Sequence, residues 1–342
     1  MPLAHRTLII KLGSLGDILQ SSPVISAISD HYKGKIDVVT FSGHGELFEN
    51  HPHVSQVWEI PRRGWSRFIR LYRLRQQRYD LIFNLHRSIW LDILAWFVGA
   101  KDRVGFSSPE KTTLFLTAWA AFDLEISRHK RYLSLVQLAV KSVISLHKYP
   151  PVFFPGPQLN QGLVVNSASH IVIAPFGGKN VDATMRSRRW PYYSQLMTKI
   201  LDLSPSCHIS LVGGGEDVSD LLALRAPFSN NVQVVTPTIN ELAYLLKSTA
   251  LFIGNDSFPL AMAVTQGCPV IGIFGPTDSK KIIQETALVS TIQGHAVCAP
   301  CYNPLEGHKN IAYHCPYEYR CIRQVSVEMV LNECKKKAPF LA

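Results

Sequence analysis

The sequence contains no apolar run long enough to cross a bilayer. The longest stretches, residues 89–100 and 114–122, fall short of the roughly 20 residues that a spanning helix needs, and Asp92 interrupts the first. No secretory signal is visible either, because residues 1–6 run directly into an apolar strand pattern without a small-residue cleavage site. We therefore expect a cytoplasmic protein that is soluble or attached to a membrane surface.

Acidic residues are scarce relative to basic ones. The chain of 342 residues has 35 Lys and Arg against 25 Asp and Glu, which gives a formal net charge of +10. This balance implies an acidic partner, which is nucleic acid, anionic lipid or a phosphorylated substrate, and composition does not choose among them. Seven cysteines in a reducing compartment argue against a disulfide framework.

The sequence shows no internal repeat and no low-complexity tail, apart from the short lysine run at residues 335–337. Instead, short apolar runs alternate with helical patterns, which indicates parallel sheets covered by helices. The predicted strands are residues 8–11, 36–40, 57–60, 81–85, 171–174, 208–212, 232–235, 251–253 and 270–274.

A proline-rich passage, residues 149–169, separates the two sets of predicted strands and has the composition of a linker. The length of the chain suffices for two domains that each bury a core. We therefore expect an α/β protein with two Rossmann-like, doubly wound parallel-sheet domains, residues 1–157 and residues 168–342, the second with a cysteine-rich C-terminal segment.

The stretch of residues 251–278 follows the pattern of strand, turn, helix, strand and glycine turn. Asp256 and Ser257 follow the first apolar run where a helix begins, and the second run stops at Gly275-Pro276. A helix that begins just after a strand presents free N–H groups and its positive dipole end, which suits a phosphate or diphosphate. The alternative is that Asp256 and Ser257 only cap this helix.

A similar element is predicted near the N-terminus. The strand pattern of residues 7–11 leads into the turn Gly13-Ser-Leu-Gly16, and Asp17 begins a helical pattern that extends to Ile28. The turn lacks the full G-x-G-x-x-G spacing and a Walker lysine, so it gives only weak support for a dinucleotide site or a P-loop.

Three short motifs follow one another along the chain: Lys11-Leu-Gly-Ser-Leu-Gly16-Asp17, Ser187-Arg-Arg-Trp-Pro191, and Gly254-Asn-Asp256-Ser257 with Phe274-Gly-Pro-Thr277. In order and spacing they resemble the ADP-heptose:lipopolysaccharide heptosyltransferases, glycosyltransferase family 9. The resemblance extends from about residue 7 to about residue 330. It implies the GT-B arrangement, in which two Rossmann-like domains face each other across a cleft.

The resemblance also implies an inverting transfer of a heptose, or a related sugar, from an ADP-sugar to a lipopolysaccharide core or a similar phosphorylated, lipid-linked saccharide. The N-terminal domain would bind the acceptor and the C-terminal domain the nucleotide sugar. No catalytic metal is expected, because the family uses protein cations and helix N-termini to stabilise the leaving diphosphate. The protein would work at the cytoplasmic face of the inner membrane, in peripheral contact with it, and not on nucleic acid.

Asp17 matches the residue that serves as base in the family, where a base takes the proton of the acceptor hydroxyl. Its alternative role is to cap the helix that follows. Arg188 matches a position where the family usually has lysine, and it would neutralise the departing diphosphate. The alternative is that Arg188 and Arg189 are both solvated surface residues and that Trp190-Pro191 only starts a helix, and for Arg189 we expect this alternative. Lys11 and Gly16 are assigned to donor binding.

Asp256 and Ser257 match the donor-binding pair of the family, with the Ser257 hydroxyl directed at the phosphates. The chain departs from the family pattern beside them, because Phe258 replaces a glycine and Ala261 stands where histidine is frequent. A phenyl ring there would narrow the approach of the diphosphate, and the missing histidine removes one donor.

Glu216 follows the glycines at residues 213–215 and is placed like the acidic residue that binds the donor ribose in the family. Asp217 competes with it for this role, and a plain turn is the third alternative.

The segment of residues 62–78 places seven arginines among aromatic and aliphatic residues over the length of a helix. Such a helix would lie on anionic lipid or bind a phosphorylated lipid acceptor. The alternative is a solvated helix on the outer face of a sheet, with Phe68, Leu71 and Tyr72 buried.

Four cysteines lie in a loop-rich segment near the C-terminal end: Cys298, Cys301, Cys315 and Cys321. A C-x2-C pair followed by two further cysteines suits a four-thiolate site for structural zinc or iron. The second pair lacks the spacing of a zinc ribbon. His308 or His314 is therefore an alternative ligand, and unpaired buried thiols are an alternative to any metal site.

Two other functions stay open at this point. The first is a catalytically weakened homologue that binds a nucleotide sugar and assists another transferase, which Phe258 and Ala261 motivate. The second is a nucleic-acid-binding protein that uses the arginine segment and the cysteines. It fits the charge, but it leaves Asp17 and the Asp256-Ser257 pair unexplained.

Overall fold

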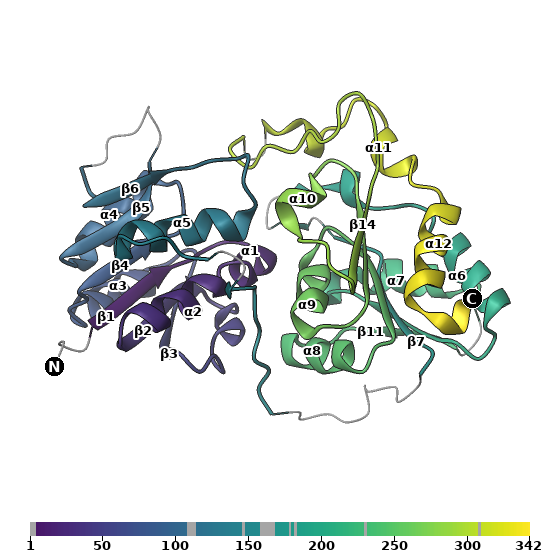
Figure 1. Cartoon of the computed structure of the whole chain (residues 1–342), viewed down its shortest axis with the longest axis horizontal. Helices are drawn as coiled ribbons and strands as arrows, with labels where there is room; N and C mark the ends of the chain where they lie inside the picture. The colour runs from purple at the N-terminus through teal and green to yellow at the C-terminus, as the bar shows by residue number, and fades with distance from the viewer. Residues whose placement is uncertain are drawn as a thin grey trace. The chain divides into compact units, whose positions relative to one another are not determined.

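The structure is a computed structural model that describes residues 5–107, 114–145, 148–157, 168–177, 179–180, 183–228, 231–306 and 309–342. The chain divides into two compact units, Met1–Gly156 and Pro157–Ala342. Each unit contains a six-stranded parallel sheet with helices on both faces (Figure 1). The predicted α/β class with two Rossmann-like sheets is confirmed.

The N-terminal unit has the strand order β3-β2-β1-β4-β5-β6, with every neighbouring pair parallel. This is the order of the Rossmann fold, in which the winding reverses between the first and fourth strands. The strands are β1 (His5–Ile10), β2 (Gly34–Phe41), β3 (Val54–Ile60), β4 (Leu81–Asn84), β5 (Asp102–Ser107) and β6 (Ala118–Ala121). The helices are α1 (Leu15–Leu19), α2 (Ser22–His31), η1 (Gly45–Leu47), α3 (Ser66–Arg75), α4 (Ile89–Val98) and α5 (Arg128–Val140).

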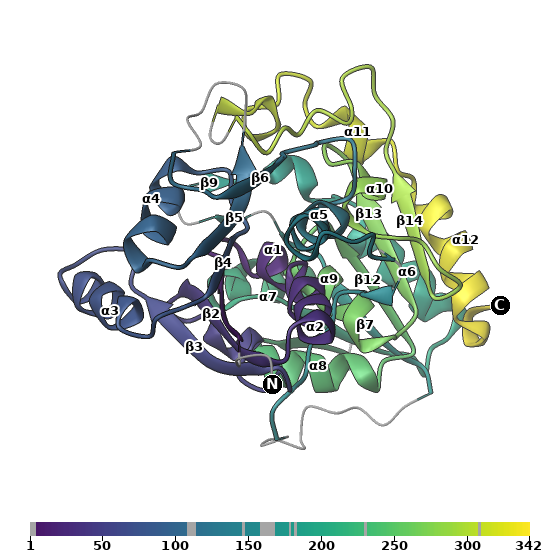
Figure 2. The same cartoon turned by 60° about the vertical axis from the view of Figure 1, so that its left-hand side comes forward.

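Two helical layers cover this first sheet. Leu74 of α3 and Ala95 and Val98 of α4 are buried against Leu8, Ile10 and Ile82 of the strands. Helices α2 and α5 pack against each other on the opposite face, as Figures 1 and 2 show. The apolar strand patterns that predicted β1, β2 and β4 therefore correspond to buried side chains, whereas the edge strand β3 is only partly buried.

The C-terminal unit repeats the same winding, with the order β11-β10-β7-β12-β13-β14 and all neighbours parallel. Its main strands are β7 (His170–Ala174), β10 (His208–Val212), β11 (Val232–Val235), β12 (Leu251–Asn255), β13 (Val270–Phe274) and β14 (Val289–Gln293). A two-stranded antiparallel ribbon joins β8 (Lys179–Asn180) to β9 (Ala183–Thr184).

Helices flank this second sheet on both faces. Those along the first part of the unit are η4 (Arg186–Arg188), α6 (Tyr193–Leu203), η5 (Gly215–Asp217), α7 (Val218–Arg225), α8 (Ile239–Lys247) and α9 (Phe258–Gln266). The later ones are α10 (Ser279–Ile282), η7 (Ile311–Tyr313), α11 (Arg320–Arg323), α12 (Val327–Lys337) and η8 (Pro339–Leu341). Helices α6 and α12 pack on one face, where the core contains Leu196, Ile200 and Val330, and α8 and α9 lie together on the other (Figure 1).

The predicted linker lies partly outside the described residues, and its first part is packed rather than free. Tyr149 donates a hydrogen bond of 2.9 Å to the Asp30 carboxylate at the end of α2. The Val152 N–H donates to the Ser22 hydroxyl at 2.8 Å, and Phe153 is buried. The chain therefore returns along α2 before it leaves the N-terminal unit.

Among the helices in the described part of the chain, none combines the length and the apolar character that a membrane crossing requires.

Candidate active site

Each sheet reverses its winding at one point, and doubly wound sheets bind ligands beyond the carboxyl ends of the strands at that point. The reversal lies between β1 and β4 in the N-terminal unit and between β7 and β12 in the C-terminal unit. The loops after β1 and β12 carry the motifs at residues 11–17 and 254–257. The fold therefore places both motifs where such sheets bind ligands.

Asp17 lies in the first turn of α1, where its carboxylate forms an ion pair with Arg128 of α5. The N-cap residue of α1 is Ser14, whose backbone is extended. Asp17 therefore does not cap this helix, and the alternative role proposed from the sequence does not apply. The Asp17 side chain is 35% exposed, so the carboxylate is accessible from solvent.

Lys11 and Gly16 belong to the same loop but differ in their surroundings. The Lys11 ammonium is buried, donates a hydrogen bond of 2.8 Å to the Tyr132 hydroxyl, and lies 4.8 Å from the centre of that ring. Gly16 is the second residue of α1 and is half-buried. Lys11 thus connects the loop to α5 inside the unit, and the assignment of both residues to donor binding stays a prediction.

Sequence reasoning missed three residues that hold this loop, namely His86, Arg128 and Tyr132. His86 follows β4, and its Nε2 accepts a hydrogen bond of 2.8 Å from the Leu12 N–H. Burial, together with the nearby Lys11 ammonium, holds the pKa of His86 well below its usual value, so the imidazole beside the loop is neutral. His86 had one signal in the sequence, its place directly after a predicted strand. Arg128 and Tyr132 had none, because they come from a helix far along the chain.

Arg188 and Asp256, which the sequence assigned to the same ligand, lie together in the structure. The Arg188 Nε is 3.3 Å from an Asp256 carboxylate oxygen, and both side chains are mostly buried. The Arg188 guanidinium also lies 4.8 Å from the centre of the Tyr302 ring. Two motifs that are distant in sequence therefore form one site at the carboxyl end of β12.

Ser257 occupies the N-cap position of α9 with an extended backbone, but its hydroxyl forms no capping hydrogen bond. Within the described residues, the buried Ser257 Oγ has no hydrogen-bond partner, and neither has the buried Thr277 Oγ1 in the turn after β13. Capping therefore does not account for the Ser257 hydroxyl. A Cβ placed on Gly177 would lie 2.9 Å from the Ser257 Cβ, so glycine permits the loop after β7 to pass close to this serine.

Asn255 joins the end of β12 to the loop after β7 and to α6 through hydrogen bonds of its side chain. It is fully buried at the end of β12, where its Nδ2 donates to the Pro175 carbonyl at 2.7 Å. Its Oδ1 accepts a hydrogen bond of 3.0 Å from the Tyr193 hydroxyl. The amide thereby fixes the end of β12 relative to the loop after β7 and to α6.

Phe258 and Ala261 both lie on α9. Phe258 is the first residue of the helix and is half-buried, whereas Ala261 is buried one turn further on. Phe258 therefore directly follows the N-cap residue Ser257 at the start of the helix.

Arg189 is not the solvated residue that the sequence analysis expected. Its side chain is only 20% exposed, forms ion pairs of 3.7 Å with Asp217 and 3.8 Å with Asp220, and lies over the Phe176 ring. Asp217 also accepts a hydrogen bond from the Gly214 N–H, so it takes part in a structural network. Glu216, next to it after β10, is exposed.

The four cysteines of the predicted metal site gather around the turn after β13. The N–H groups of Cys301 and Tyr302 both donate to the Pro276 carbonyl at 2.9 Å. Burial raises the pKa of the Cys301 thiol to about 11, and the nearby thiols of Cys321, Cys298 and Cys315 shift it in the same direction. All four are free thiols.

The arrangement of these thiols is not that of a formed metal site. Across the residues that the structure describes, no three His, Cys, Asp or Glu side chains are placed to hold a metal ion. Of the two histidines considered as alternative ligands, His314 is exposed and His308 lies outside the described residues.

Comparisons with known proteins agree with this architecture. The chain is 22% identical over 285 residues to lipopolysaccharide heptosyltransferase 3 of Escherichia coli, a match that covers 77% of this chain and 81% of that protein. The structure of a family 9 glycosyltransferase from Veillonella parvula has the same fold, with a TM-score of 0.81 and 17% identity over 100% of this chain and 98% of that one.

A third similar protein is TibC of enterotoxigenic E. coli, described as a dodecameric, iron-containing heptosyltransferase and solved in complex with ADP-D-β-D-heptose. That complex matches 99% of this chain and 77% of its own, with a TM-score of 0.57 and 13% identity. The sequence model of glycosyltransferase family 9 (heptosyltransferase) matches residues 67–311, well over half of the chain. The chain therefore belongs to glycosyltransferase family 9, the heptosyltransferase family.

Proposed function

We propose that this glycosyltransferase moves a heptose, or a related sugar, from an ADP-sugar to a lipopolysaccharide core or a similar phosphorylated, lipid-linked acceptor, with inversion at the transferred carbon. Membership of the family supports the sugar transfer. The names of the similar proteins support the choice of ligands, since one acts in lipopolysaccharide synthesis and another was solved with an ADP-heptose. The reaction would take place at the cytoplasmic face of the inner membrane.

The proposed binding of the ADP-sugar donor in the C-terminal unit rests mainly on one observation. The buried hydroxyls of Ser257 and Thr277 have no hydrogen-bond partner within the described residues, at the carboxyl ends of the adjacent strands β12 and β13. A buried hydroxyl without a partner is costly, and the oxygens of a bound diphosphate would supply the missing partners. The N-terminus of α9 adds its positive dipole end at the same end of the sheet, and the Arg188 guanidinium, which is paired with Asp256, is a cation that could turn to a diphosphate there.

The reaction requires a base and a stabilised leaving group. The acceptor oxygen attacks the anomeric carbon of the sugar while the bond from that carbon to the diphosphate breaks. The Asp17 carboxylate takes the proton of the acceptor hydroxyl, and ADP departs with the electron pair of the broken bond. Arg188 and the α9 N-terminus compensate the charge that develops on the diphosphate, and Glu216 is the candidate contact to the ribose.

Isothermal titration with ADP and with a short RNA or DNA duplex separates the proposal from its alternatives. The enzyme is expected to bind ADP and not the duplex, and to release ADP when ADP-heptose and acceptor are both supplied. Binding of ADP without turnover would indicate the weakened homologue that Phe258 and Ala261 motivate. Binding of the duplex alone would overturn the assignment.

A structural zinc or iron ion at Cys298, Cys301, Cys315 and Cys321 stays a prediction. Its support is the gathering of four thiols in a segment with little apolar core, and the iron reported for TibC. Because the thiols as described are not in a ligand arrangement, metal binding would have to draw them together. Elemental analysis of protein purified without chelator should give about one metal ion per chain, as a closed four-ligand site holds. Metal-free protein whose melting temperature is unchanged in chelator would contradict the prediction.

A further inference from the structure

Helix α3 turns its larger apolar side chains toward solvent. Trp65, Phe68, Ile69 and Tyr72 are 86%, 56%, 57% and 58% exposed, whereas only Leu74 is fully buried. Their spacing of three, four and seven residues puts these four side chains on one face of the helix. The Trp65 and Phe68 rings are in contact, with centroids 5.8 Å apart. This contradicts the alternative that Phe68 and Tyr72 are buried against the sheet.

The same segment has a large uncompensated positive charge. Residues 61–79 contain seven arginines and no acidic residue. In the described part of the chain, none of these arginines forms an ion pair with a carboxylate. Arg70 donates to the Glu59 carbonyl at 2.6 Å and Arg75 donates to the Phe97 carbonyl, so both keep their full charge at the surface.

Helix α4 extends this surface. It packs beside α3 through Ala95 and Val98 and exposes Trp96 and Phe97 at its C-terminal end. The Arg75 guanidinium lies 5.3 Å from the centre of the Phe97 ring, which connects the ends of the two helices. Exposed apolar side chains that occur singly are ordinary, but a contiguous group of this size marks an interaction surface.

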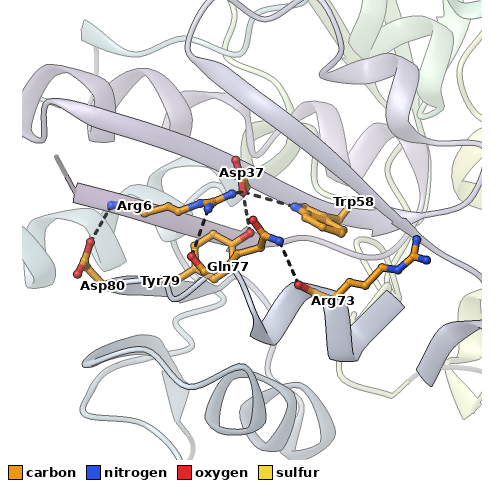
Figure 3. Close-up of polar contacts among 7 residues, drawn as sticks. All are labelled: Arg6, Asp37, Trp58, Arg73, Gln77, Tyr79 and Asp80. Atoms are coloured by element: carbon orange, nitrogen blue, oxygen red, sulfur yellow. Dashed lines mark hydrogen bonds and ion pairs between the residues drawn. The ribbon is translucent and has the colours of Figure 1, made fainter. Parts of the chain in front are cut away.

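A buried polar network fixes α3 to the sheet, so the apolar face does not result from a loose helix (Figure 3). The Arg6 guanidinium donates to the Asp37 carboxylate at 3.0 Å and to the Gln77 carbonyl at 3.2 Å. Tyr79 also donates to Asp37, at 2.7 Å, and the Gln77 side chain donates to the Arg73 carbonyl. The guanidinium of Arg73 points away from this network.

We propose that the exposed face of α3, with the end of α4, docks onto a bilayer that contains anionic lipid. Tryptophan, tyrosine and phenylalanine suit the interface of a membrane, and a helix with an apolar stripe among arginines suits one that lies in its plane. The uncompensated charge is complementary to anionic headgroups. A second copy of the chain is a poorer occupant, because it would bring seven arginines of each copy together.

The test is co-sedimentation of the full chain with phosphatidylcholine vesicles, with or without phosphatidylglycerol, at low and high salt. Binding is expected only with phosphatidylglycerol, and it should weaken as salt increases. The double variants Trp65→Ser/Phe68→Ser and Arg67→Gln/Arg73→Gln should each bind roughly tenfold or more weakly, since each removes two interfacial groups.

Two matched controls remove similar groups from the C-terminal unit. Val297→Ser/Tyr317→Ser deletes exposed apolar side chains there, and Arg320→Gln/Arg323→Gln deletes the same charge from α11. Both controls should bind vesicles like the wild type.

The proposal would be overturned if the protein did not bind anionic vesicles, or if the test and control variants lost vesicle binding equally. It would also be overturned if Trp65→Ser/Phe68→Ser disrupted a dimer or an RNA complex while vesicle binding stayed unchanged. The assay contains neither donor nor acceptor, so its outcome does not depend on the proposed transfer reaction.

Discussion

A substitution of Asp17 can test catalysis without removing the cap of α1, because Ser14 and not Asp17 occupies the N-cap of this helix. Asp17→Asn should lower turnover by roughly 100-fold or more, the usual scale for loss of a general base. The affinity for ADP and the melting temperature should change little. Arg128→Gln, which removes the partner of the carboxylate, should show a smaller loss of turnover. Near wild-type turnover in Asp17→Asn would exclude Asp17 as the base.

Arg188 and Arg189 are neighbours in sequence with different surroundings, so each serves as the control for the other. Arg188 faces Asp256 and Tyr302, whereas Arg189 pairs with Asp217 and Asp220. Arg188→Ala should lower kcat with the ADP-sugar roughly 100-fold, the usual effect of removing one group that stabilises the charge developing in the transition state. Arg188→Lys should restore part of this loss, because lysine keeps the positive charge. Arg189→Ala should lower the melting temperature and leave kcat nearly unchanged. Equal kinetics for Arg188→Ala and wild type would exclude the role.

Ser257 and Ser326 are both N-cap residues, but only Ser326 uses its side chain as a cap, accepting from the Met329 N–H. Ser326→Ala should therefore lower the free energy of unfolding by about 1 kcal/mol. Ser257→Ala should have almost no such cost and should weaken binding of ADP more than binding of adenosine. Titration calorimetry and chemical denaturation measure the two effects. An equal loss for ADP and adenosine would mean that Ser257 acts on the fold.

At the scale of secondary-structure elements, the network beneath α3 gives a stability prediction. Asp37 is fully buried and accepts hydrogen bonds from Arg6 and Tyr79. Asp37→Ala therefore deprives the Arg6 guanidinium and the Tyr79 hydroxyl of the carboxylate that they bind. We expect a loss of roughly 3 kcal/mol, the scale for breaking a buried pair from one side. Denaturant unfolding measures this loss.

The control is Lys148→Ala, which breaks an exposed ion pair with Asp30 on the same unit and leaves the hydrogen bond from Tyr149 to Asp30 in place. Exposed pairs contribute less than about 1 kcal/mol. Similar losses for the two variants would show that the Asp37 network is no more important for stability than a surface pair.

The strands that the sequence predicted are those in which apolar residues predominate, although several contain a polar residue, such as Asp37 in β2 and Gln233 in β11. Strands β12 and β13 are buried along their whole length, and each of the nine predicted strands overlaps an observed one. The pattern missed β5, β6 and β14, because their sequences DRVGFS, AWAA and VSTIQ include polar or small residues. It also merged α1 and α2 into one helix.

The candidate site was predictable only where its residues belong to contiguous motifs. Asp17, Arg188, Asp256 and Ser257 each lie in a short run with its own spacing. The residues that hold these groups, such as His86 and Tyr132, come from other elements and meet the motifs only through the parallel winding of the sheet. Arg189 was misjudged for the same reason, since its acidic partners follow a different strand.

At the scale of the whole molecule, the two units share one strand order although their sequences show no repeat. Each unit places a motif at the reversal of its winding: the first carries the accessible Asp17 carboxylate, and the second carries Asp256, which pairs with Arg188, and the buried Ser257 hydroxyl. This division of groups suits a reaction that needs a base for one substrate and cationic stabilisation for the other. The α3–α4 face adds a third surface, which we assign to the membrane that would present a lipid-linked acceptor.

Mass spectrometry of the lipopolysaccharide core from a deletion strain tests the central claim most directly. The core should lack one heptose, or the related sugar that this enzyme transfers, together with any residues that are attached to it. The wild-type chain should restore the missing mass, and Asp17→Asn should not. A core of unchanged mass in the deletion strain would contradict the account.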